Sequence, residues 1–141
     1  MPDFAIARPN VGWVEVLAEN CIKGGGAVQA VTALRRDYDI SLHSVGLSIG
    51  SADGVNAECL RHVSALNASL EPSLVSDHLS WSMSGGVYLS ALLPLSYTAE
   101  ALDVVCRNID QVQSTLNRRI LIENISAYVH FHHSEISEPD F

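Results

Sequence analysis

The fold is best predicted from residues 40–51, ISLHSVGLSIGS. Apolar residues recur through this stretch, which carries a single histidine, His43, followed by several glycine and serine residues. The apolar residues of the run fall on both faces of an extended chain. That pattern is typical of a parallel strand covered on each side. We therefore predict a strand over Ile40 to Leu47 and expect His43 to lie at its carboxyl end.

Similar apolar segments occur elsewhere in the chain, and sequences with helical spacing lie between them. Segments rich in Val, Ile and Leu predict further strands over residues 13–18, 73–78 and 119–123. Apolar residues at helical spacing predict helices over residues 27–37, 56–70 and 99–116. Asn56 and Thr98 are the expected N-caps of the last two helices. The order β-α-β-α-β-α-β predicts an α/β fold of right-handed crossovers on a parallel sheet.

Length and composition limit the class of protein. The 141 residues, 48% of them hydrophobic, suffice for one domain with a core. A net charge of -8 disfavours binding to nucleic acid or to anionic lipid. The sequence shows no membrane-spanning run and no signal region, so we expect a cytoplasmic protein. The three cysteines fit neither a disulfide framework nor a CxxC motif.

Polar side chains lie at the carboxyl end of each predicted strand. In chain order they are Glu19 and Asn20 after the first strand, His43 in the second, Asp77 and His78 in the third, and Glu123 and Asn124 at the end of the fourth. Because parallel strands end at the same rim of a sheet, we expect these side chains to converge. Two imidazoles with one or more carboxylates suit iron, zinc or manganese. The sequence therefore predicts a metal site at this rim.

Other interpretations of the same residues stay open at this point. A histidine near a strand end is more often a hydrogen-bonded structural residue than a ligand. Asp77 could fix the imidazole tautomer of His78 or form a surface ion pair. The HFHH run at 130–133 suggests a metal cluster, but a solvated turn with adventitious binding is the safer interpretation.

Several longer motifs occur in a fixed order along the chain. They are WVEVLAEN (13–20), SLHSVGLSIGS (41–51), LEPSLVSDHLSWS (70–82), LLPLSYTAEAL (92–102), VQSTLNRRILIENISAY (112–128) and SEISEPDF (134–141). Together they resemble the multinuclear non-heme iron-dependent oxidases. This family was long described as a domain of unknown function and includes the methanobactin-biosynthesis oxidase.

The resemblance implies both a fold and an activity. The family fold is a (β/α)8 barrel of the xylose-isomerase type, with two or three irons at the carboxyl rim. Its members use dioxygen to remodel cysteine, or other residues, in a ribosomally made precursor peptide. Many act with a small partner protein that presents the leader of that peptide.

The matching motifs also imply individual roles. His43 in the LHxVGLSxG motif and His78 in SDHLxW would be iron ligands, and Glu123 in LEN would bridge two metals. Gly46 and Gly50 would then let the backbone turn tightly around the site.

Four further residues, Glu19, Asn20, Asp77 and Asn124, are expected at the rim around those ligands. Glu19 and Asn124 are weaker counterparts of family positions than His43, His78 and Glu123 are.

The chain departs from the family pattern in sequence and in length. Leu17 stands where the family usually has histidine, and Ala91 stands where it has aspartate. A complete barrel needs roughly 250 residues, so we expect residues 1–141 to form a single partial barrel of about four βα units. The first strand of the family and its later strands, with their ligands, would be absent. We therefore expect one iron here, or none.

Three functions follow from these observations. In the first, the chain is part of an iron-dependent oxidase that modifies a precursor peptide. In the second, it is a non-catalytic half-barrel that self-associates through exposed sheet edges. In the third, it is a metal-dependent isomerase or lyase with its site on a barrel rim.

Overall fold

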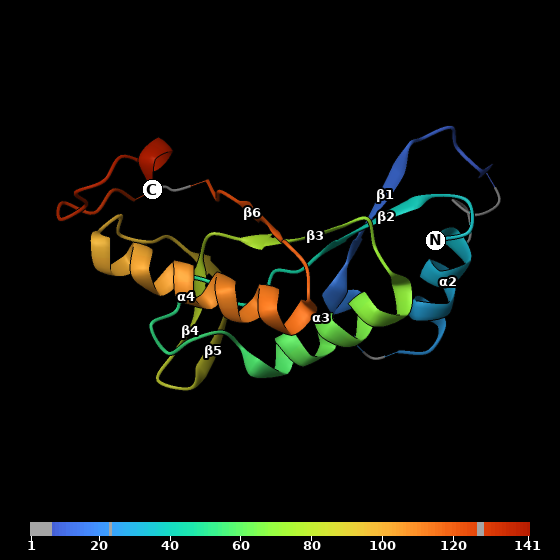
Figure 1. Cartoon of the computed structure of the whole chain (residues 1–141), viewed down its shortest axis with the longest axis horizontal. Coiled ribbons are helices and arrows are strands. Elements are labelled where there is room, and N and C mark those ends of the chain that lie inside the picture. Colours follow the sequence, from blue (N-terminus) through green and yellow to red (C-terminus); the bar gives the residue numbers. More distant parts are fainter. Residues whose placement is uncertain (1–6, 23, 127–128) are drawn as a thin grey trace.

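The computed structural model describes residues 7–22, 24–126 and 129–141, whose arrangement Figure 1 shows. A parallel four-stranded sheet has the strand order β1-β2-β3-β6, formed by Trp13–Leu17, Asp39–His43, Leu74–His78 and Leu121–Glu123. The helices are α2 (Gly26–Leu34), α3 (Ala57–Leu70) and α4 (Ala99–Leu116). The smaller elements are the 3-10 turns η1 (Ala18–Cys21) and η2 (Glu138–Asp140) and the antiparallel hairpin β4 (Trp81–Ser84) and β5 (Val87–Leu93).

The predicted alternation of strands and helices is confirmed. Each strand of the sheet pairs in parallel with the next one along the chain, and a helix lies in every connection. Both predicted N-caps are present. The Asn56 side chain accepts hydrogen bonds from the backbone N–H groups of Glu58 and Cys59, and that of Thr98 accepts one from Ala101.

All four strands of the sheet are shorter than predicted, two of them by a single residue, and in the other two backbone groups near the strand ends bond elsewhere. The predicted strand from Ile40 to Leu47 ends at His43, since the N–H groups of Val45 and Leu47 donate to carboxylates. The strand predicted from residue 119 begins at Leu121, since the N–H of Ile120 donates to a glutamine side chain. The helix predicted over residues 27–37 ends at Leu34.

The β4–β5 hairpin was not predicted from the sequence. Its two strands are joined by Gly85 and Gly86, which have φ angles of 58° and 75°. Positive φ at both central residues is the requirement of a type I′ turn, which glycine meets without strain. The hairpin lies between β3 and α4 and so interrupts the third crossover.

The apolar core fills one side of the sheet, and the expectation that both faces are covered holds only in part for the described residues. The opposite face is buried at His43 and His78 but exposed nearer the amino ends of the strands. Figure 1 shows α2, α3 and α4 on the same side of the strands. Side chains on that face, such as Ile40, Leu42 and Val75, are at most 1% exposed. On the opposite face Trp13, Leu74 and Leu121 are 56%, 44% and 53% exposed. The carboxyl ends of the strands meet at one rim, where the last residues of β2 and β3, His43 and His78, lie on this second face and are buried.

None of the described helices has the length and apolar character needed to span a bilayer.

Candidate metal centre

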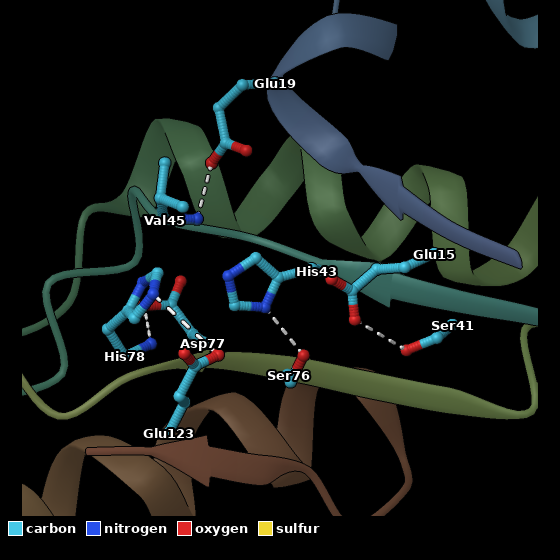
Figure 2. Close-up of polar contacts among 9 residues, drawn as sticks. All are labelled: Glu15, Glu19, Ser41, His43, Val45, Ser76, Asp77, His78 and Glu123. Carbon is cyan, nitrogen blue, oxygen red and sulfur yellow. Dashed lines mark hydrogen bonds and ion pairs between the residues drawn. The ribbon is translucent and has the colours of Figure 1, made fainter. Parts of the chain in front are cut away.

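His43, His78 and Glu123 lie together where three neighbouring strands end. They are the last residues of β2, β3 and β6, and the parallel register pairs His78 directly with Glu123. One possible ligand atom from each residue lies within 4.8 Å of those of the other two. The imidazoles meet edge to face with ring centroids 4.6 Å apart. The predicted convergence is therefore confirmed for these three residues (Figure 2).

The cluster is buried on the histidine side and open on the carboxylate side. His43 and His78 are 8% and 9% exposed, whereas the Glu123 side chain is 61% exposed. Nε2 of His78 lies 3.9 Å from Oε2 of Glu123. Water and small solutes can thus approach the cluster past Glu123.

The electrostatics favour a neutral His78. Burial, and then the charge on a protonated His43, lower the pKa of His78 below its usual 6.5. Near pH 7 this imidazole therefore offers a lone pair instead of a charge. Its Nδ1 is buried and has no hydrogen-bond partner among the described residues, a situation that costs free energy unless another group binds there. The donor set and its charge state therefore fit a divalent metal.

The turn after His43 is held by two carboxylates, one from each neighbouring strand end. Oε1 of Glu19 accepts hydrogen bonds from the Ser44 hydroxyl and the Val45 N–H, both at 3.0 Å. Oδ2 of Asp77 accepts one from the N–H of Leu47 at 3.1 Å. Figure 2 shows Glu19 and Asp77 on opposite sides of the chain that follows β2. The two acidic residues therefore fix the backbone that carries His43.

The interpretation of Asp77 as part of a surface ion pair is wrong, because its side chain is fully buried. Its oxygens accept hydrogen bonds from the backbone N–H groups of Leu47 and His78. Asp77 therefore fixes the backbone at these two residues. Burial raises the pKa of Asp77 from 3.8 to about 7, although these hydrogen bonds oppose the shift.

Gly50 lies in a turn, as predicted, which the hydrogen bond from the N–H of Ser51 to the Ser48 carbonyl closes, but neither Gly46 nor Gly50 has a positive φ. Both are needed for space. A Cβ on Gly46 would lie 3.0 Å from Sγ of Cys59, and one on Gly50 would lie 2.6 Å from Cδ2 of Leu95. In this loop the left-handed conformation belongs to Ser48, with a φ of 60°.

The remaining predicted rim residues lie outside the cluster. Asn20 is exposed in η1, and Asn124 is exposed and donates a hydrogen bond to Oε1 of Glu138 at 3.3 Å. The histidines of the HFHH run are exposed and join no group of possible ligands among the described residues.

Two buried polar residues near the site were missed from the sequence. Oγ of Ser76 lies 2.8 Å from Nδ1 of His43. Asn108 of α4 donates hydrogen bonds to the carbonyl oxygens of Ile49 and Ser51. Ser76 could have been found, because it lies two residues before His78 and so shares its strand face. The sequence carries no comparable signal for Asn108.

Comparison with known proteins decides the family. A family model described as "RiPP precursor modification enzyme MbnB/TglH/ChrH" matches residues 1–141, the whole chain. The chain belongs to this family. RiPPs are ribosomally made peptides that are modified after translation, so the resemblance found in the sequence motifs is confirmed at the level of the RiPP-modification family.

Several curated relatives of this chain come from bacteria. UPF0276 proteins of Vibrio parahaemolyticus and Vibrio vulnificus are each 48% identical to it, over 139 and 135 residues. A UPF0276 protein of Acaryochloris marina is 42% identical over 134 residues. These alignments cover 98%, 95% and 95% of this chain but 48%, 46% and 49% of the relatives. The chain thus spans about half the length of the curated relatives it matches.

Proposed function

We propose that His43, His78 and Glu123 are ligands of an iron centre in an oxidase that modifies cysteine or other residues of a ribosomally made precursor peptide. The observation that carries the proposal is the meeting of two imidazoles and one carboxylate at the ends of three parallel strands, within 4.8 Å. Membership of the RiPP-modification family supports the peptide as substrate.

The chemistry of the donor set favours iron among the metals that fit. Two histidines and one carboxylate that leave coordination positions open are the ligand set of non-heme Fe(II) oxygenases. Bound iron would supply one-electron chemistry with dioxygen at the positions that the protein leaves free. Glu123 is the exposed member of the set, so it is the residue placed to take part in a second metal site.

The chain's own residues would hold and orient such a centre. The buried histidines come from adjacent strands of the sheet, and Glu19 and Asp77 fix the turn that follows His43. Rigid strand ends give a metal site the positional precision that loops lack.

We further propose that the sheet is part of a (β/α)8 barrel of the xylose-isomerase type. Parallel strands joined by helices on a single side, with the candidate ligands on the other face at the carboxyl ends, match the layout of such a barrel. The exposed Trp13, Leu74 and Leu121 would then face the barrel interior. A small partner protein that presents the peptide leader belongs to the same proposal.

Metal analysis of protein purified without oxygen tests the assignment. We expect iron in the wild type and none in the His43→Ala/His78→Ala double variant. A His130→Ala/His133→Ala double variant is the matched control, because it also removes two imidazoles but leaves the cluster intact. Iron retained by the first variant, or absent from the wild type when iron is supplied, would contradict the proposal.

A second candidate function, self-association of a half-barrel, is favoured by the three large apolar side chains exposed on the second face of the sheet. It predicts a dimer or larger species of the chain in solution. Sedimentation of Trp13→Ser/Leu121→Ser protein beside the wild type tests it, and an unchanged monomer in both would exclude it.

A further inference from the structure

The candidate centre requires a particular tautomer of His43. A neutral imidazole has one N–H and one lone pair, and only the nitrogen with the lone pair can bind a metal. In Figure 2 Nε2 of His43 faces His78, whereas Nδ1 faces Ser76. Nε2 is therefore the atom placed to bind, and Nδ1 must carry the hydrogen.

Ser76 is placed to accept that hydrogen. Its Oγ lies 2.8 Å from Nδ1 of His43, and both side chains are at least nine-tenths buried. The parallel register puts the two residues directly opposite each other on β2 and β3. The carbonyl oxygen of Ser76 also accepts a hydrogen bond from the N–H of Ser44 at 2.8 Å. Ser76 is thus fixed on both its backbone and its side chain relative to His43.

We infer that Ser76 is a positioning residue, which holds His43 in the Nδ1–H tautomer and so presents the Nε2 lone pair to the metal. The inference rests on the proposed metal site, which it deepens. Ligating histidines generally donate their second ring N–H to a fixed acceptor, and loss of such an acceptor lowers metal affinity about 10- to 100-fold. The opposite arrangement, in which the hydroxyl donates to Nδ1, would leave the hydrogen on Nε2 and block binding there.

The tautomer can be measured without any metal. Nitrogen-15 NMR of the imidazoles distinguishes the two neutral forms, at about pH 8, well above the ordinary histidine pKa of about 6.5. We expect His43 in the Nδ1–H form in the wild type and in Ser76→Thr, which keeps the hydroxyl. We expect a shift toward the Nε2–H form in Ser76→Ala. A His43→Gln variant assigns the resonances.

Metal affinity gives the second readout. Titration with Co(II), followed by its visible absorption bands, should show binding about 10- to 100-fold weaker in Ser76→Ala than in the wild type. Ser41→Ala is the matched control, because Ser41 is a buried serine on the same face of β2 whose hydroxyl contacts Glu15 instead of a histidine. Its affinity should match that of the wild type, and Ser76→Thr should restore most of the loss.

The outcomes separate this inference from the proposed function. If the wild type binds Co(II) and Ser76→Ala binds it equally well, or if the metal-free wild type shows the Nε2–H tautomer, the role of Ser76 is refuted while the metal site stands. If the wild type binds no metal, the proposed function fails, and the role given to Ser76 fails with it.

Discussion

Replacing Asn108 by alanine should destabilise the protein more than any exposed substitution on the same helix. Asn108 lies in α4 and is 6% exposed. Its Nδ2 donates hydrogen bonds to the carbonyl oxygens of Ile49 at 2.8 Å and Ser51 at 2.9 Å. These two bonds tie α4 to the loop between β2 and α3.

The size of the effect follows from the two bonds. Each buried hydrogen bond contributes about 1 kcal/mol, and a buried carbonyl left without a donor costs about 1–3 kcal/mol more. The Ser51 carbonyl keeps a second donor, the N–H of Gly54, so only the Ile49 carbonyl is left without one. Alanine regains about 0.5 kcal/mol as the better helix former. We therefore expect the free energy of unfolding of Asn108→Ala to fall by about 2.5 to 4.5 kcal/mol.

Urea unfolding measures this free energy, and an unchanged m-value would show that only stability has changed. Gln111→Ala is the control, because Gln111 is exposed on the same helix and should change stability by less than about 0.5 kcal/mol. Asn108→Asp keeps the shape but has no N–H to donate, so it should lose at least as much. A loss for Asn108→Ala no larger than that of the control would refute the reasoning.

Three further predictions concern packing, pH and metal. Gly50→Ala should lower the free energy of unfolding by about 1–3 kcal/mol through its clash with Leu95, and adding Leu95→Ala should recover part of the loss, measured as a double-mutant cycle. The pKa of Asp77 is higher in the folded protein than in the unfolded chain. Its contribution to the free energy of unfolding is therefore largest at low pH and is lost as the pH rises toward 7. Between about pH 5 and 8 the wild type should lose about 2 to 3 kcal/mol relative to Asp77→Asn, and parallel pH profiles would contradict this. Fe(II) at 100 times its Kd should raise the unfolding free energy by about 2.7 kcal/mol, and a chelator should reverse the gain; no change in melting temperature with iron would count against a folded-state site.

Features that depend on the spacing of apolar residues and on the order of the elements along the chain were predictable from the sequence. Apolar segments and helical spacing gave the order of the elements, and the caps at Asn56 and Thr98 followed from side-chain chemistry. The convergence of His43, His78 and Glu123 followed from topology, because parallel strands end at one rim.

Details that depend on tertiary contacts were not predictable. The end of β2 is decided by carboxylates from Glu19 and Asp77, which bond to the backbone that would otherwise continue the strand. Gly50 is explained by Leu95, far along the chain. The exposure of Trp13, Leu74 and Leu121 on the second face of the sheet could not be inferred either, since their apolar character alone predicts burial.

The parallel arrangement of the strands also has a kinetic consequence. Residues that meet at the rim are far apart in sequence, since His43 and Ser76 are 33 positions apart. Long loops must close before such contacts form, and chains rich in non-local contacts fold slowly. The candidate ligand set can therefore assemble only after the two crossovers that join β2 to β3 and β3 to β6 have docked. Metal uptake would then report on completion of the sheet, and a chain caught partway through folding could not bind the ion with all three side chains.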